Sequence, residues 1–196
     1  MKSFPLTALA LGIGANFLLG ASISKAASVP AGQPAMVDLS ERTLPDLKAE
    51  FNRTSARTRI ILLLSPTCPT CLQGSTAIQK VLKSYSQSSV AVFAVWEPML
   101  PTDWGKPGTR VLRRLGDNRV RQFWDPNHLV AAALKKAEGA GQLHPGCCTR
   151  NGFLWDLIAA YARNAQWKEM LPEPILFNGT MVDTAPRLAS VLASGK

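Results

Sequence analysis

Residues 59–71 read RIILLLSPTCPTC, in which a run of branched apolar residues is followed at once by two cysteines spaced as Cys-x-x-Cys. A continuous apolar run of this length is typical of a strand that is covered on both faces of a sheet. Apolar residues then recur at helical spacing from Ile78, which predicts a helix that ends near Tyr85. Cys68 and Cys71 are therefore expected between a buried strand and the start of a helix.

The segments around this unit continue the alternation of strands and helices. A second buried strand is predicted at Val90–Trp96, and the order strand, helix, strand implies a parallel pair joined by a right-handed crossover. Further predicted elements are a helix around residues 44–51, a short basic helix at 109–115, a strand at 119–124 and a helix that starts at Pro126 with Asp125 as its N-cap. The segment at 153–161 fits either a strand or a helix, and a strand is preferred. This order predicts an α/β fold.

The last part of the chain contains Asn178-Gly179 between two short apolar runs, at 175–177 and 180–182. Asn-Gly in such a place is a strong local signal for a β-hairpin. Beyond it, Leu188 and Leu192 mark the apolar face of a predicted final helix.

Length and composition narrow the class of protein. The chain has 196 residues, which suits one domain that can bury a core without disulfides as staples. Apolar residues make up 46% of it, which excludes a wholly disordered protein. The formal charge of +9 permits an acidic partner but does not require one. A signal peptide is expected at residues 1–26, a flexible segment at 27–39 and one domain at 40–196.

The N-terminal segment has the order of a secretory signal. A basic start is followed by an apolar run to Gly20 and by small residues, with cleavage expected after Ala26. An uncleaved membrane anchor is the alternative, because the run is nearly long enough to span a bilayer. Either interpretation predicts an extracytoplasmic protein, periplasmic or secreted, in a compartment where disulfides persist.

The place of the motif at a helix start decides its chemistry. Unpaired backbone N–H groups and the positive end of the helix dipole stabilise a thiolate, which would make Cys68 reactive at neutral pH. Cys71 lies about one turn on and could attack a mixed disulfide to release a partner. Pro69 suits the first helical position, which needs no N–H. Zinc is disfavoured because no second pair repeats the spacing, and a structural disulfide that never turns over is the other alternative.

This unit resembles the active-site region of the thioredoxin-like superfamily, and residues 174–179 resemble that family's cis-proline, strand and hairpin. Residues 122–126, followed by a helix, resemble the extracytoplasmic, TlpA-like branch. The resemblance implies a three-layer α/β sandwich with a central mixed sheet flanked by helices. It also implies a thiol–disulfide oxidoreductase that uses no cofactor and no metal.

The resemblance assigns roles to individual residues. Cys68 would attack, Cys71 would resolve, and Pro174, in preference to Pro172, would be the cis-proline that shapes the site. The partners would be protein thiols or disulfides and a redox partner. Nucleic acid is not expected as a partner, and membrane contact is expected only through the N-terminal segment.

The sequence departs from the family pattern around the motif. Thr67 stands where thioredoxins usually have Trp, and Pro69-Thr70 stands where they have Gly-Pro. The strand before the motif also lacks the acid that often relays protons in this family. Glu97 could substitute for that acid from the end of the second strand, although a solvated loop acid is the preferred interpretation.

Cys147 and Cys148 are adjacent in a turn-rich loop, and three hypotheses stay open for them. They could exchange electrons with Cys68 and Cys71, bind a soft metal such as Cu(I) together with His144, or form a structural disulfide. The soft-metal hypothesis is the alternative function, a binding module on a thioredoxin-like scaffold. Structural or auxiliary redox use is preferred to metal binding.

One histidine and a local cluster of arginines are expected to have no role in a functional site. His128 is expected on an exposed helix surface rather than as a ligand. Five arginines between 110 and 121 form a local basic cluster, and a solvated basic face is preferred to a partner surface. The cluster lacks the interleaved aromatics of a nucleic-acid motif.

Overall fold

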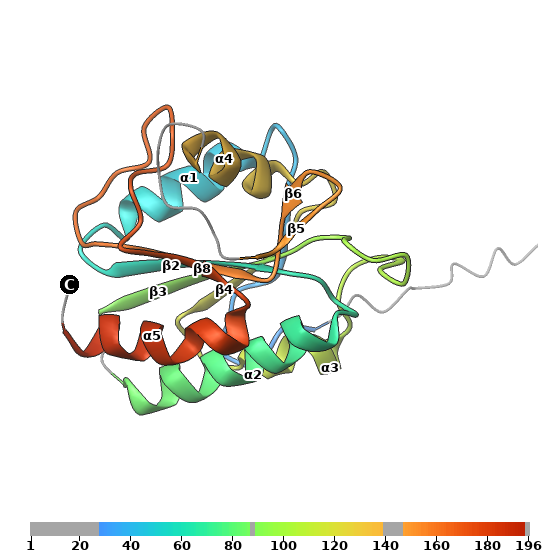
Figure 1. Ribbon diagram of the computed structural model, residues 1–196, viewed down its shortest axis with the longest axis horizontal. Helices are drawn as coiled ribbons and strands as arrows, with labels where there is room; N and C mark the ends of the chain where they lie inside the picture. The colour runs from blue at the N-terminus through green and yellow to red at the C-terminus, as the bar shows by residue number, and fades with distance from the viewer. Residues whose placement is uncertain (1–27, 87–88, 139–146, 195–196) are drawn as a thin grey trace, which may run out of the picture.

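The structure, a computed structural model, describes residues 28–86, 89–138 and 147–194. A central sheet lies between two layers of helices, with α1 and α4 on one side and α2, α3 and α5 on the other (Figure 1). The strands are β1 (Val37–Asp38), β2 (Thr58–Leu64), β3 (Val90–Trp96), β4 (Val120–Trp124), β5 (Thr149–Arg150), β6 (Phe153–Leu154), β7 (Leu157–Tyr161) and β8 (Leu176–Gly179). The helices are α1 (Leu44–Arg53), α2 (Pro69–Ser84), α3 (Thr109–Leu112), α4 (Leu129–Glu138) and α5 (Met181–Ala193), and the 3₁₀ turn η1 (Arg113–Leu115) follows α3.

The six-stranded sheet has the order β1-β4-β3-β2-β7-β8 and is mixed. Strand β2 pairs in parallel with β3 and antiparallel with β7, and β8 runs antiparallel to β7. Every residue of β2 and β3 is buried, as the continuous apolar runs predicted. The predicted α/β sandwich with a central mixed sheet flanked by helices is confirmed.

Alternate side chains of β2 face the two helical layers. Ile60, Leu62 and Leu64 belong to the core beneath α2 and α5, whereas Ile61 and Leu63 belong to the core beneath α1 and α4. Cys68 and Cys71 lie in the first of these cores. The motif therefore sits at the carboxyl end of the central strand and on the α2 side of the sheet.

Helices α2 and α5 lie close together beneath the sheet. A Cβ atom at Gly74 of α2 would lie 2.6 Å from Cβ of Met181, so this contact requires glycine. Met181 begins α5, whose N-cap Thr180 accepts a hydrogen bond from the backbone N–H of Asp183. The starts of α2 and α5 are therefore fixed against each other at one edge of the sheet.

The predicted hairpin at Asn178-Gly179 is wrong. These residues end β8, and the chain enters α5 directly, because Thr180 and Asp183 provide a helix start. The hairpin forms instead at Asn151-Gly152, between β5 and β6. Both turn residues have positive φ, of 50° and 83°, as a type I′ turn requires.

Three other segments of the chain also differ from what the sequence predicts. Helix α4 begins at Leu129 rather than at Pro126, although Asp125 still accepts a hydrogen bond from Val130 N–H at 2.8 Å. The strand predicted at 153–161 is divided into β6 and β7. The segment 27–39, expected to be flexible, contacts the domain from residue 28 onwards, because Gln33 donates to two backbone carbonyls near η1 and residues 37–38 form β1.

The expected signal segment, residues 1–26, lies outside the described residues. Among those that are described, no helix combines the length and the apolar character needed to cross a bilayer.

Candidate redox site

Cys68 and Cys71 lie on the first turn of α2, as the sequence predicted. Cys68 is the N-cap of the helix and Pro69 occupies its first turn. Sγ of Cys68 accepts a hydrogen bond from the backbone N–H of Cys71 at 3.3 Å and lies 3.0 Å from the hydroxyl oxygen of Thr70. Both cysteines are buried and unpaired, with 2% and 0% of their surface exposed. The arrangement presents one sulfur to the N–H groups of the helix start.

These contacts make the two thiols unequal. A hydrogen bond from the Cys71 thiol, together with those from Thr70 and the Cys71 N–H, outweighs burial and lowers the pKa of Cys68 to about 6. The same Cys68–Cys71 hydrogen bond, burial and the nearby charge of Asp156 raise the pKa of Cys71 above its usual range. At neutral pH the pair therefore holds a thiolate at Cys68 and a thiol at Cys71.

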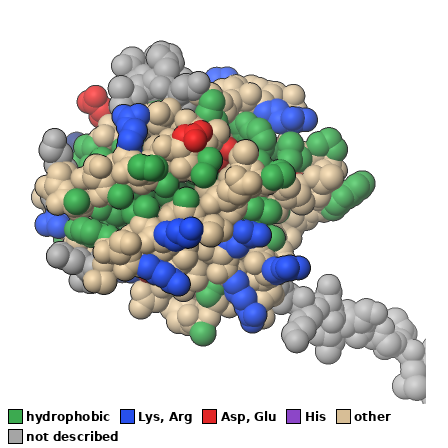
Figure 2. Space-filling view, turned by 60° about the horizontal axis from the view of Figure 1, so that its bottom comes forward, with side chains coloured by type: hydrophobic (Ala, Val, Ile, Leu, Met, Phe, Trp, Pro, Cys, Tyr) green, Lys and Arg blue, Asp and Glu red, His purple; other side chains and the backbone are tan. Residues whose placement is uncertain are grey.

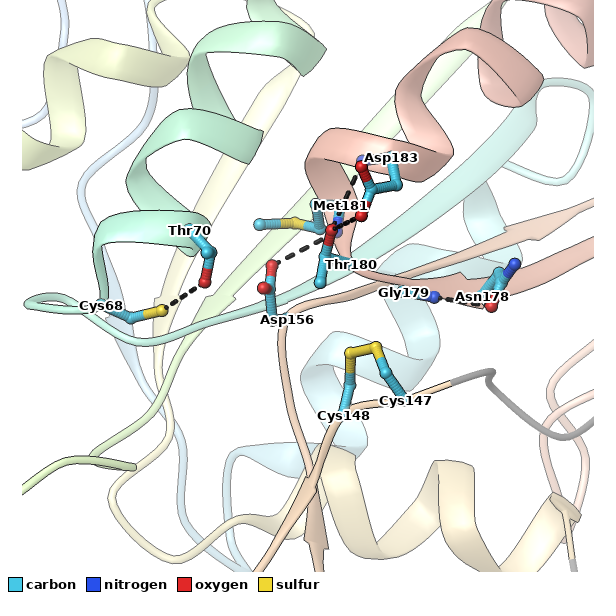
Figure 3. Close-up of a disulfide and its surroundings, with 10 residues drawn as sticks. All are labelled: Cys68, Thr70, Cys147, Cys148, Asp156, Asn178, Gly179, Thr180, Met181 and Asp183. Atoms are coloured by element: carbon cyan, nitrogen blue, oxygen red, sulfur yellow. Dashed lines mark hydrogen bonds between the residues drawn. A yellow bond between two sulfur atoms is a disulfide. The ribbon is translucent and has the colours of Figure 1, made fainter.

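Asp156 completes the site, although it is not among the residues that the sequence predicts for it. It is 3% exposed and lies between β6 and β7 with a φ of 49°, and its Oδ1 accepts a hydrogen bond from Met181 N–H at 3.3 Å (Figure 3). One carboxylate oxygen and the sulfurs of Cys68 and Cys71 all lie within 4.8 Å of one another. An acid directly before an apolar strand was the available signal, but only the antiparallel pairing of β7 with β2 shows where that acid lies.

The loop before the motif is held by Asp103. Its carboxylate accepts hydrogen bonds from the Ser65 hydroxyl, from the N–H and hydroxyl of Thr67, and from two backbone N–H groups at 99 and 100. Burial opposes the charge, but these bonds outweigh it and hold the pKa of Asp103 below its usual range. The exposed Trp104 follows directly. This anchor fixes the approach of the chain to Cys68.

Glu97 does not have the exposed position that the sequence suggested. It is fully buried and its Oε2 lies 2.8 Å from Nδ1 of His128. Burial raises the pKa of Glu97 to about 7, against the opposing effect of His128. His128 is half-buried and stacks on Phe153, so its expected exposed position is also wrong. Residue alternation along β3 directs Glu97 to the α4 side of the sheet, whereas Cys71 lies on the α2 side.

Pro174 is not part of the site, which corrects the prediction. Ile175 donates to the carbonyl of Ala160, and Ala160 pairs with Ile60 near the start of β2. The proline therefore lies at the end of the sheet opposite to Cys68. The one cis peptide bond among the described residues joins Gly179 to Thr180, so Pro172 and Pro174 both follow trans bonds. The error follows from the misplaced hairpin: the strand next to β2 is β7, and the residue before it is Asp156.

Cys147 and Cys148 form a disulfide with each other, which is one of the three arrangements that the sequence allows (Figure 3). Trp155 N–H donates to the carbonyl of Cys148. A Cβ atom at Gly179 would lie 2.5 Å and 2.9 Å from the two disulfide sulfurs and 2.6 Å from the carbonyl oxygen of Asp156. The pair packs beside the Asp156 backbone and in this form offers no thiolate to a soft metal. His144, the third proposed ligand, lies outside the described residues.

The basic cluster between residues 110 and 121 is not a uniform solvated face. Arg119 is largely buried, pairs with Asp117 at 2.7 Å and also donates to backbone carbonyls at the end of α2. Arg121 forms an ion pair with Glu50, with 3.4 Å between a guanidinium nitrogen and a carboxylate oxygen. Figure 2 shows Lys and Arg side chains among hydrophobic and neutral ones on the face that carries α2 and α5.

Comparison with known proteins does not assign this chain to a family. No family model matches the chain, and no curated protein does. A solution structure of a thioredoxin-like protein in the oxidised form is 16% identical, with a TM-score of 0.47 over 71% of this chain and 80% of that one. The thioredoxin domain of a thiol-disulfide oxidoreductase from Bacteroides vulgatus is 9% identical, with a TM-score of 0.36 over 70% of this chain and 83% of that one. Neither likeness is close enough to argue from, so activity is inferred from the site itself.

Proposed function

We propose that this protein is an exported thiol–disulfide oxidoreductase of the thioredoxin-like superfamily, in its TlpA-like branch, that acts on protein thiols and disulfides. The observation that carries the proposal is the geometry of α2. One cysteine caps the helix and accepts its N–H, while the other is fully buried one turn on. Thiol–disulfide exchange needs this division between an attacking thiolate and a protected resolving thiol.

The reaction would run in two exchanges. The Cys68 thiolate attacks one sulfur of a substrate disulfide, forms a mixed disulfide and releases the other substrate sulfur as a thiolate. Cys71 then loses its proton and attacks Sγ of Cys68, which breaks the mixed disulfide and forms the Cys68–Cys71 disulfide. Two electrons pass from the protein to the substrate, and a redox partner returns them by the reverse exchanges.

Asp156 is placed to act in the second exchange. Its carboxylate lies within 4.8 Å of both sulfurs and is largely screened from water. It would accept the proton that Cys71 must lose before attack. Export is supported by the signal-like pattern of residues 1–26, and the extracytoplasmic location and the protein partners belong to the same proposal.

The test is to incubate the protein, with Cys68 and Cys71 as thiols and the Cys147–Cys148 disulfide intact, with a small aromatic disulfide whose thiolate product absorbs light. The intact pair should release two product thiolates per chain. Cys71→Ser should release one and keep the other half of the reagent on Cys68, as seen by mass spectrometry. Cys68→Ser should react much more slowly, because its remaining site thiol is protonated and buried.

The matched control is the double variant Cys147→Ser/Cys148→Ser, which should still release two thiolates. Reagent found on Cys71 in preference to Cys68, or equal reaction of the two single variants, would contradict the proposed roles.

A further inference from the structure

Asp156 adds a third donor atom to the two sulfurs of the redox site. The residue is 3% exposed, and one of its carboxylate oxygens lies within 4.8 Å of Sγ of Cys68 and of Sγ of Cys71. With both thiols deprotonated, three negative groups would share a buried space 4.8 Å across. Such a cluster is costly unless a cation or a proton neutralises part of it.

We propose that the reduced protein binds one Zn²⁺ ion through Cys68, Cys71 and Asp156. Two thiolates and one carboxylate are ligands that Zn²⁺ accepts, whereas Mg²⁺ and Ca²⁺ prefer sets of oxygen atoms and Cu(I) prefers sulfur alone. Three protein ligands would leave a fourth tetrahedral position open to water or to a substrate.

The spacing of the donor atoms suits this ion. With Zn–S bonds of about 2.3 Å, tetrahedral geometry places two sulfur ligands about 3.8 Å apart. The three donor atoms lie within 4.8 Å of one another, so closing the two sulfurs around the ion requires a shift of at most about 1 Å.

The elements that carry the ligands are firmly held. Cys68 and Cys71 lie three residues apart on the first turn of α2, and residues at that spacing share one helix face. Asp156 is fixed by the hydrogen bond from Met181 N–H, and Met181 packs against Gly74 of α2. The site also lies near the surface, because Thr67, Pro69 and Thr70 around it are exposed. An ion could therefore enter without unfolding of the sheet.

Binding would depend on the redox state of the cysteines. Entry of Zn²⁺ releases the Cys71 proton, and the ion then occupies the same sulfurs that exchange needs. Oxidation to the Cys68–Cys71 disulfide removes both thiolate ligands and should expel the ion. Zn²⁺ would bind the same residues that the proposed exchange uses, but its binding does not require that exchange occurs.

The test is a titration of the full chain, reduced and freed of metal, with Zn²⁺ in competition with a chelating dye. One ion per chain is expected, and Asp156→Asn, which keeps the shape and removes the charge, should weaken binding about tenfold or more. Asp156→Glu should restore part of the affinity. The matched control Asp46→Asn changes an exposed acid of α1, on the other side of the sheet, and should bind as the original chain does.

Co²⁺ replaces Zn²⁺ as a spectroscopic probe if a variant folds poorly. The original chain should show thiolate-to-cobalt charge-transfer absorption and the strong visible bands of tetrahedral Co²⁺, and both should vanish after oxidation. Failure of the reduced chain to bind either ion, or equal Zn²⁺ affinity of Asp156→Asn and the original chain, would overturn the proposal. Exchange assays with chelator present test the proposed function separately.

Discussion

The two cysteine pairs both lie near Asp156, but their surroundings differ. Cys68 and Cys71 are free thiols at the start of a 16-residue helix, and the first sulfur accepts a backbone N–H. Cys147 and Cys148 are joined to each other in a loop and pack against Gly179. Reactivity therefore depends on the electrostatic environment of a sulfur rather than on the number of cysteines.

The largest expected difference between the pairs is in thiolate reactivity. Cys68, with a pKa of about 6, should be mostly thiolate at pH 7, about 30-fold more so than a cysteine with a pKa of about 8.5. Alkylation rates measured by mass spectrometry should fall as the pH drops through 6, because the sulfur becomes protonated. Cys147 and Cys148 should resist alkylation at every pH until their disulfide is reduced. A midpoint for Cys68 near 8.5 would show that the helix start does not stabilise the thiolate.

A smaller effect is expected from crowding the second pair. Gly179→Ala would place a Cβ atom 2.5 Å from Sγ of Cys148 and 2.6 Å from the Asp156 carbonyl. Overpacking of this kind should lower the free energy of unfolding by about 1–3 kcal/mol. Gly108→Ala is the matched control, because nothing lies within 4 Å of its Cβ position. Denaturant unfolding measures both variants, and equal stability would mean that the disulfide does not pack closely against Gly179.

The first pair could be predicted from the sequence because its placement depends on neighbouring residues. The apolar run at 60–64, the turn, Pro69 and the helical spacing after Cys71 are local patterns, and each is confirmed. Strand β3 and the parallel pairing follow from the same short-range reasoning.

The rest of the site depends on contacts between distant segments. Asp156 reaches the cysteines through the pairing of β7 with β2, and no local pattern shows that pairing. Glu97 is buried and lies against His128, 31 residues later in the chain. Pro174 was misplaced because Asn178-Gly179 has the composition of a turn, whereas the capping residues Thr180 and Asp183 start a helix there.

The central claim, that Cys68 and Cys71 are a reversible redox pair, is tested most directly by equilibrating the protein in a series of glutathione buffers. Differential alkylation and mass spectrometry then give the fraction of Cys68–Cys71 disulfide at each potential. A single two-electron transition is expected, with a midpoint between about −270 and −120 mV, the range from thioredoxin to strong oxidants. Thiols that persist in the most oxidising buffer, or a disulfide that persists in the most reducing one, would contradict it.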